Sequence, residues 1–240
     1  MTRARIIGVA GGSGGVGASS LVAAVAVRAA RRGLAVACVD LRRFGGGLDV
    51  VFGVDHEPAV RWPDLARAHG RLDVPELLAR LPSAEGVHVV SCDRAAPTVL
   101  RPEACRAVVD GLAEHVDLVV VDLPGPDLPE HAPSLELLHE ALLVCGSDPP
   151  ALAAAGVYLR RDVEAALPWG LVQRVSRHEQ DRLPRVVAAA LRLPLVAIAP
   201  DDDRVLQDLR RGRVPGLRGT FATTADEVLD AVTEPMRRSA

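Results

Sequence analysis

The stretch "GGSGGVGASS", residues 11–20, follows a short apolar run, "RIIGVA", and decides how the rest of the chain is interpreted. Residues 12–19 match the phosphate-binding pattern G-x-x-x-x-G-K-[ST] at every fixed position except the lysine, where Ala18 stands. Such glycines let main-chain N–H groups converge on a phosphate, and the helix that follows points its positive end at the same place. Ser19 would supply a hydroxyl ligand to Mg²⁺. The predicted nucleotide-binding residues of the loop are Gly12, Ser13, Gly14, Gly15, Val16, Gly17, Ala18, Ser19 and Ser20.

The lysine missing from this loop cannot come from elsewhere in the sequence. The 28 basic residues are all arginine, and the chain has no lysine. The main-chain donors of the loop survive this loss, but the point charge on the outer phosphates does not. We therefore expect weak nucleotide affinity, and a larger loss of hydrolysis because the charge of the transition state goes unbalanced.

The same letters allow two other interpretations. "GSGGVG" also fits the dinucleotide-binding pattern G-x-G-x-x-G, and Asp40 ends the second predicted strand at about the spacing of a ribose-binding acid. A dehydrogenase is excluded because Tyr158, the only tyrosine, stands in "YLRR" with no lysine after it. A dinucleotide-binding module stays an alternative, as does a glycine turn that only packs a strand against a helix.

Composition favours an ordinary folded protein of the cytosol. With 49% hydrophobic and 25% charged residues and a net charge of −3, the chain resembles neither a basic polyanion-binding module nor a disordered protein. No apolar run is long enough to span a membrane, and we see no signal-peptide pattern at the N-terminus. The four scattered cysteines show no metal-binding or disulfide pattern, and the seven histidines have no metal-ligand spacing.

Apolar runs alternate with helical patterns along the whole chain. Continuous apolar strands indicate a sheet covered on both faces, so the pattern predicts an α/β fold with a mostly parallel, doubly wound sheet flanked by helices. Residues 1–232 are expected to form a single domain and residues 233–240 a short loose tail. Residues 42–86 are less regular. The predicted strands are 5–10, 35–40, 87–91, 117–122, 141–145, 170–175 and 193–199, and the clearest predicted helices are 20–33, 101–115, 149–167 and 181–192.

A second motif supports a nucleotide site. "VDLVVVDLPG" has the form of a buried strand that ends in Asp122, followed by a turn at Pro124 and Gly125. In a parallel sheet this carboxylate would lie beside the loop after the first strand, where it can hold a magnesium-bound water. Alone, Asp122 could equally be an aspartate that caps a turn. Together with the loop, it favours descent from a nucleotide-binding protein, with Ser19 and Asp122 as the metal-binding residues.

Taken together, these segments resemble the deviant-Walker MinD/ParA ATPases, which are P-loop NTPases, and most closely their CpaE/TadZ-like branch. That branch includes actinobacterial septum-site-determining and secretion-neighbourhood CpaE-like proteins. The resemblance covers nearly the whole chain. It rests on "GGSGGVGASS", "VACVDLRRFGGGLDVVFG", "DLVVVDLPG", "GLVQRVSR" and "LPLVAIAPDDDRVLQDLRRGRVPG".

The departures from the family pattern concern charged positions. The resemblance places the signature lysine, which in active members reaches across a dimer, at Ser13, and the Walker A lysine at Ala18. Asp40 is kept, but the second, water-orienting aspartate falls on Arg42, and the base-contacting asparagine falls on Gln173. The loop glycines, the magnesium-binding hydroxyl and the strand-end carboxylate remain. If the chain is an active ATPase, the carboxylates of Asp40 and Asp122 are its catalytic groups.

Arg42 has two interpretations. Its guanidinium could enter the phosphate site and replace part of the lost charge, since arginine binds phosphate through two parallel hydrogen bonds. Alternatively, Arg42 and Arg43 form a solvated surface pair, which the usual exposure of arginine favours. In neither case can Arg42 orient a water as an aspartate does.

The resemblance implies a protein that localises or assembles a Tad-type pilus or secretion system, or that regulates the septum site. We expect a homodimer with little or no ATP hydrolysis, with ATP and Mg²⁺ as weak ligands and pilus, secretion or cell-division proteins as partners. The chain would be cytoplasmic and possibly recruited peripherally to the membrane, pole or septum. The arginines near the end alternate with aspartates, so we expect no sequence-specific nucleic acid binding. Alternatives are an active ATPase that uses Arg42 or a partner-supplied cation, and a nucleotide-independent scaffold.

Overall fold

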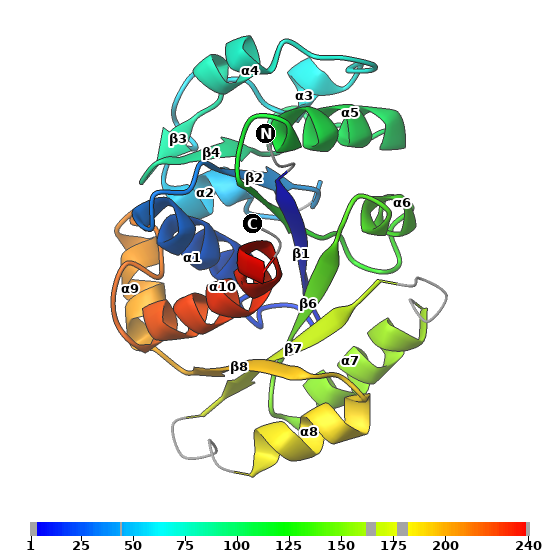
Figure 1. Ribbon diagram of the computed structural model, residues 1–240, viewed down its shortest axis with the longest axis vertical. Coiled ribbons are helices and arrows are strands. Elements are labelled where there is room, and N and C mark those ends of the chain that lie inside the picture. The colour runs from blue at the N-terminus through cyan, green and yellow to red at the C-terminus, as the bar shows by residue number, and fades with distance from the viewer. Residues whose placement is uncertain (1–3, 44, 162–166, 177–181, 239–240) are drawn as a thin grey trace.

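The computed structural model describes residues 4–43, 45–161, 167–176 and 182–238. Its strands form one eight-stranded sheet in the order β3-β4-β2-β5-β1-β6-β7-β8 (Figure 1). All neighbouring strands are parallel except β3 and β4, which pair in antiparallel fashion at one edge. The predicted mostly parallel sheet is therefore confirmed. The strands are β1 (Arg5–Gly11), β2 (Val36–Asp40), β3 (Ser83–Ala84), β4 (Val87–Val90), β5 (Leu118–Asp122), β6 (Glu140–Cys145), β7 (Trp169–Val175) and β8 (Leu195–Pro200).

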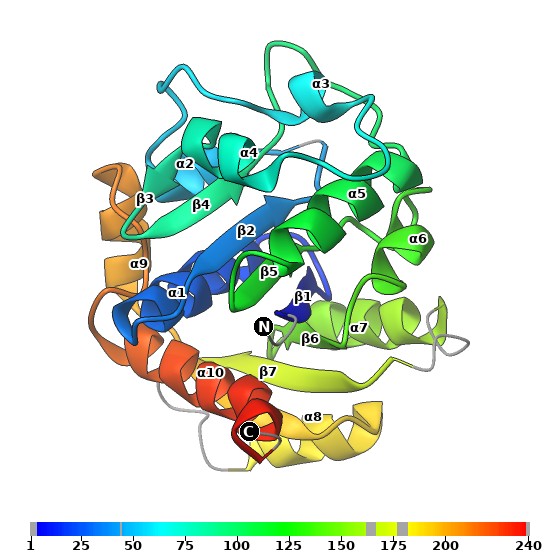
Figure 2. The same cartoon turned by 45° about the horizontal axis from the view of Figure 1, so that its top comes forward.

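Helices cover both faces of the sheet (Figures 1 and 2). Helices α1 and α10 lie together on one face, and α5, α7 and α8 lie on the other. The long helices are α1 (Ala18–Arg31), α5 (Pro102–Ala113), α7 (Pro149–Arg161), α8 (Leu183–Leu191), α9 (Asp203–Arg210) and α10 (Thr220–Arg238). The short helices are α2 (Leu48–Phe52), α3 (Trp62–Leu65), α4 (Val74–Arg80) and α6 (His131–Leu135).

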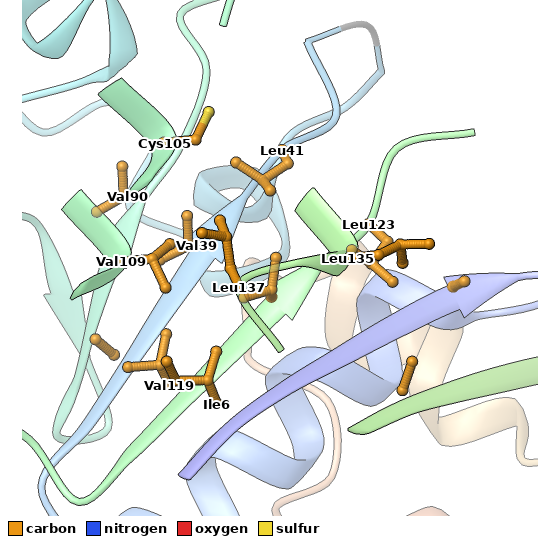
Figure 3. Close-up of a cluster of buried hydrophobic side chains, with 14 of the residues drawn as sticks. Ile6, Val39, Leu41, Val90, Cys105, Val109, Val119, Leu123, Leu135 and Leu137 are labelled. Carbon is orange, nitrogen blue, oxygen red and sulfur yellow. The ribbon is translucent and has the colours of Figure 1, made fainter. Parts of the chain in front are cut away.

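The central strands are apolar at successive positions because each of their faces is packed. In β5, Val119 and Val121 belong to the cluster under α5, part of which Figure 3 shows, while Leu118 and Val120 belong to the cluster under α1. All four side chains are fully buried. Alternation in the strand thus divides its residues between two cores, as expected for a sheet covered on both sides.

The last helix packs against the first. Arg28 of α1 and Arg32, which caps the C-terminal end of α1, both form ion pairs with Asp226 of α10, each at 2.7 Å. The helix continues to Arg238, so the loose tail expected from residue 233 is wrong for residues 233–238. Thr233 is buried, and its hydroxyl donates to the carbonyl of Leu229 at 2.7 Å, which satisfies this polar side chain inside the helix.

Other differences from the sequence expectations lie in short elements. The irregular region 42–86 contains the helices α2, α3 and α4 and the two-residue strand β3. The predicted helix 149–167 extends to Arg161 as α7, and its residues 162–166 lie outside the described part. Cys38, Cys92, Cys105 and Cys145 are all free and buried.

Candidate functional site

The glycine loop joins the carboxyl end of β1 to α1 and is shaped by left-handed backbone. Gly15 and Gly17 have φ angles of 75° and 96°, which only glycine adopts readily, and a Cβ added at either would meet nothing within 4 Å. The N–H of Gly12 donates to the carbonyl of Val144 on β6 at 2.9 Å and fixes the start of the loop. Within the described residues, the main-chain N–H groups of residues 13–20 donate no hydrogen bond. The loop therefore presents a group of unsatisfied donors at the N-terminus of a helix.

A cavity of about 300 Å³, here called the loop cavity, lies against these donors. It is bounded by the carboxyl ends of β2 and β5 and by the loop that follows β2, because the carboxyl ends of β1, β2 and β5 are neighbours in the sheet. Its lining residues are Ser13, Gly15, Val16, Gly17, Ala18, Ser19, Ser20, Asp40, Arg42, Gly45, Gly46, Gly47 and Asp122. The structure thus brings together most of the predicted loop residues with both predicted carboxylates.

Asp122 is buried at the bottom of the loop cavity and is only partly satisfied. The hydroxyl of Ser19 donates to its Oδ2 at 2.6 Å, while Oδ1 has no hydrogen-bond partner within the described residues. Burial is the main reason that the pKa of Asp122 rises to about 7, and the charge of Asp40 raises it further. The hydrogen bond from Ser19 and the guanidinium of Arg42 act in the opposite direction.

Asp40 lies directly beside Asp122, since the two residues are paired in the register of β2 and β5. Its carboxylate accepts hydrogen bonds from the N–H groups of Arg42 and Leu48, at 2.9 and 2.8 Å, and from the hydroxyl of Ser91 at 3.2 Å. Burial raises the pKa of Asp40 to about 6 in spite of these bonds. Two buried carboxylates side by side form a site that favours a cation.

Arg42 and Arg43 are not a solvated surface pair, which corrects the interpretation favoured by the sequence. Arg42 is half-buried and lines the loop cavity. Arg43 is turned to the β5–α6 loop, where its guanidinium lies 3.4 Å from the carboxylate of the buried Glu130. The positive charge of Arg42 acts on the buried carboxylates of Asp40 and Asp122, whereas that of Arg43 pairs with Glu130.

Arg42 also lines a second cavity, here called the lateral cavity, on the side of the loop that faces α7. This cavity has a volume of about 400 Å³. Its walls are mostly apolar, and Val157 on α7 is about half exposed. Its lining residues are Gly11, Gly12, Ser13, Gly14, Arg42, Leu123, Pro124, Gly125, Pro126, Ala154, Val157 and Tyr158.

A third cavity, here called the strand cavity, extends from the loop over the ends of β7 and β8 and has a volume of about 390 Å³. It shares Gly15, Val16, Gly17 and Ser20 with the loop cavity, so the two are parts of one cleft along the loop. Its other lining residues are Leu21, Val144, Val172, Arg174, Ala199, Pro200, Asp201, Asp202, Asp203, Val205, Leu206, Leu209 and Phe221. A mainly apolar chamber with polar groups at its rim suits a nucleoside.

Arg174 reaches the strand cavity and Gln173 does not. Arg174 donates to Asp201 at 2.7 Å and to the carbonyl of Gly15 at 3.1 Å, and so ties the loop to the ends of β7 and β8. Gln173 is fully buried, and its amide donates to the carbonyl of Gly146 at 2.9 Å. Strand alternation explains the difference, because Val172 and Arg174 face the cavity while Gln173 faces the other side of the sheet. The base contact expected of Gln173 does not follow from this geometry.

Asp202 is the clearest polar contact that the sequence interpretation missed in the strand cavity. It is the N-cap of α9 and accepts hydrogen bonds from the N–H of Arg204 at 3.0 Å and the hydroxyl of Thr220 at 2.9 Å. Burial disfavours its ionisation, but these bonds outweigh burial and lower its pKa. An aspartate immediately before a helical pattern is a capping signal that could have identified it.

In the described part of the chain, no group of three or more His, Cys, Asp or Glu residues is placed to hold a metal ion. Nor does any described helix combine the length and the apolar character that a membrane crossing requires.

No family model matches the chain. An uncharacterized protein of Mycobacterium tuberculosis is 33% identical over 228 residues, which are 93% of this chain and 63% of that protein. The chain thus spans less than two thirds of this relative's length. An uncharacterized ATP-binding protein of Methanocaldococcus jannaschii is 24% identical over 203 residues, 83% of this chain and 75% of that protein.

Solved structures show the fold. A ParA family ATPase from Chlorobium tepidum superimposes with a TM-score of 0.80 at 20% identity, over 96% of this chain and 98% of that one. The septum site-determining protein MinD from Pyrococcus horikoshii, complexed with Mg-ADP, superimposes with a TM-score of 0.80 at 19% identity, over 99% of both chains. The chain has the P-loop fold of the MinD/ParA ATPases. Membership of the CpaE/TadZ-like branch stays a prediction.

Proposed function

We propose that the cleft binds a nucleoside phosphate, with ATP as the first candidate, placing the phosphates in the loop cavity and the nucleoside in the strand cavity. The observation that carries the proposal is the row of N–H groups at residues 13–20, which donate no hydrogen bond within the described residues. An anion would satisfy these donors and would lie at the positive end of α1. The loss of the lysine lowers affinity but leaves this backbone site in place.

Magnesium fits the same site. The free Oδ1 of the buried Asp122 and the hydroxyl of Ser19 are oxygen ligands of the kind that Mg²⁺ takes, directly or through water. When bound, Mg²⁺ would neutralise phosphate charge beside the two carboxylates. Ser19 and Asp122 would hold the ion, and Asp40 would support it from the neighbouring strand.

Hydrolysis should be slow or absent. A phosphoryl-transfer site needs groups that balance the charge of the transition state and orient the attacking water. Ala18 supplies no charge, and at the position of the water-orienting aspartate stands Arg42, which lines the cavity with a cation. The protein would therefore act mainly by binding. We propose a homodimer that positions or assembles a Tad-type pilus or secretion system, or regulates the septum site, with recruitment from the cytoplasm by its partners.

Isothermal titration calorimetry with ATP and ADP, with and without Mg²⁺, tests the nucleotide site. Wild type should bind Mg-ATP, and Gly17→Val should abolish binding because it fills the cleft at the loop. Gly33→Val is the matched control: Gly33 has a φ of 87° and open space around its added Cβ, but it lies outside the cleft. Both variants should lose similar thermal stability. Absence of heat up to millimolar Mg-ATP in folded wild type would overturn the proposal.

The same sample separates the alternatives. An active ATPase would show Mg²⁺-dependent turnover that disappears in Asp122→Ala. A nucleotide-independent scaffold would have a mass in solution that ATP does not change. A dinucleotide-binding module would quench or enhance NADH fluorescence, and ATP would compete with it.

A further inference from the structure

The ion pair between Arg43 and Glu130 joins the loop after β2, which lines the loop cavity, to the loop after β5, and it carries an inference that rests on the nucleotide site proposed above. We infer that Glu130 is a positioning residue: through Arg43 it holds Arg42 in the loop cavity, where Arg42 makes the site distinguish ATP from ADP.

The two loops begin at neighbouring strands. The N–H of Leu41 donates to the carbonyl of Asp122 at the end of β5, at 3.0 Å, and the N–H of Leu123 donates to the carbonyl of Val9 on β1 at 2.9 Å. Leu41 and Leu123 are buried in the same apolar cluster (Figure 3). Beyond these roots, Arg43 and Glu130 connect the loops a second time. The segment that carries Arg42 is therefore attached to the end of β5 through Leu41 and to the β5–α6 loop through Arg43.

The β5–α6 loop has the more restricted backbone, because proline fixes φ. It contains Pro124 and Pro126, and Nδ1 of the buried His131 lies 3.1 Å from the carbonyl of Pro124. The ring of His131 packs edge-on against Tyr158 of α7, with centroids 5.3 Å apart. The β2–α2 loop instead contains Gly45, Gly46 and Gly47. Glu130 thus provides a second side-chain contact for this glycine-rich loop, beside the guanidinium of Arg94, which donates to the carbonyl of Gly46 at 2.9 Å.

Arg42 is the group that this anchor positions. Among the described residues that line the loop cavity, it is the only basic one. Its own N–H donates to Asp40, so its main chain is held from one side by Asp40 and from the other by the neighbouring Arg43. A terminal phosphate adds negative charge to a cavity that already contains Asp40 and Asp122. Among the described side chains that line the cavity, Arg42 alone can add positive charge to that of Mg²⁺, so ATP should gain more than ADP from its position.

Hydrogen exchange without nucleotide tests the positioning directly. Glu130→Gln keeps the shape of the side chain and removes its charge, so amides of Gly45 to Gly47 should exchange faster. The matched control is Glu136→Gln, which removes one charge from the exposed pair of Glu136 with Arg106 and should leave those amides unchanged. If Glu130→Gln does not fold, Arg43→Gln removes the other partner. Unchanged exchange in both Glu130→Gln and Arg43→Gln would overturn the inference, whether or not nucleotide binds.

Calorimetry then tests the consequence for the ligand. Arg42→Gln should reduce the ratio of ATP to ADP affinity about tenfold, the effect of one charge-assisted hydrogen bond. Glu130→Gln should shift the ratio in the same direction, and the double variant should lose no more than Arg42→Gln alone. Glu130→Asp should restore part of the ratio. An additive double variant, or a ratio unchanged in Glu130→Gln while wild type binds, would refute it. A wild type that binds neither nucleotide would instead refute the proposed function, and with it the role of Arg42.

Discussion

The loop cavity and the strand cavity lie end to end along one glycine loop, yet the aspartates in them have pKa values shifted in opposite directions. In the loop cavity, burial raises the pKa of Asp40 and Asp122, and Oδ1 of Asp122 has no partner within the described residues. In the strand cavity, Asp202 caps a helix and has a lowered pKa, because its hydrogen bonds outweigh its burial.

The difference indicates where the fold is optimised for stability and where it is not. Polar groups that are buried and unsatisfied destabilise a protein, and they persist mainly where a ligand completes them. In the strand cavity, the carboxylate of Asp202 has its hydrogen bonds within the protein, whereas the loop cavity contains two carboxylates of raised pKa, one of them with an oxygen that has no partner within the described residues. The alanine at position 18 leaves these groups in place.

Restoring the lysine should give the largest effect. Ala18→Lys adds a cation to the loop cavity, and a charge-assisted hydrogen bond of about 1.5–3 kcal/mol should raise ATP affinity roughly 10- to 100-fold. Ala18→Met adds similar length without charge and should leave affinity near that of wild type. Calorimetric titration of both variants measures the difference. Equal affinities of the two variants would mean that the donors of the loop do not face the phosphates.

Neutralising the buried carboxylate should stabilise the protein. The raised pKa of Asp122 means that the folded state retains a proton between about pH 4 and 7 that the unfolded state releases, so stability falls as pH rises through this window. Asp122→Asn removes that loss, although its new amide lacks an acceptor. We expect a net gain of about 1–2 kcal/mol at pH 8, a rise in Tm of roughly 2–8 °C, and a smaller gain at pH 5. Thermal unfolding at both pH values measures it, and a lower Tm at pH 8 would contradict it.

Removal of the aspartate carboxylate in the strand cavity should instead destabilise the protein. Asp202→Ala removes the N-cap of α9 and the acceptor for Thr220, and should cost about 1 kcal/mol of stability at neutral pH. Because the pKa of Asp202 is lowered on folding, its contribution is present above about pH 4 and is lost as pH falls below that. Asp202→Asn keeps the cap and is the control. Denaturant unfolding at pH 7 and pH 3 checks both statements.

Substitution of Arg174, which connects the glycine loop to the ends of β7 and β8, should have the smallest effect on stability and on ATP affinity. Arg174→Gln releases the carbonyl of Gly15 and the carboxylate of Asp201. Since the side chain of Arg174 is about half exposed, stability should change by only about 0.5 kcal/mol, while ATP affinity should fall a few-fold because the loop is less well held. Leaving affinity unchanged would show that the two cavities are independent in binding.

The sequence predicts the sheet well because each strand has a local apolar pattern and this pattern recurs along the chain. Buried parallel strands such as 117–122 are continuous apolar runs, and the loop after the first strand carries a recognisable glycine pattern. The short elements between residues 42 and 86 lack such repetition. Thr233 shows the same limit, because its hydroxyl bond to Leu229 keeps it helical where composition suggested a tail.

The charged side chains of the site were harder to place. The partner of Arg43 is Glu130, on a loop far away in the sequence, so the ordinary exposure of arginine gave the wrong expectation. Gln173 and Arg174 are neighbours in β7 and lie on opposite faces of the strand. A match of sequence motifs does not show which of the two faces the cavity.

The four buried thiols allow unfolding of the protein to be followed without an added label, because each thiol reacts only when the structure around it opens. Cys38 is fully buried in β2, between β4 and β5, and Cys92 follows β4 with 7% of its surface exposed. Burial raises the pKa of both, which keeps the sulfurs protonated and unreactive while the fold is closed. The rate of alkylation of Cys38 would therefore measure how often the central sheet unfolds. The rate of alkylation of Cys92 would measure how often the chain after β4 opens locally.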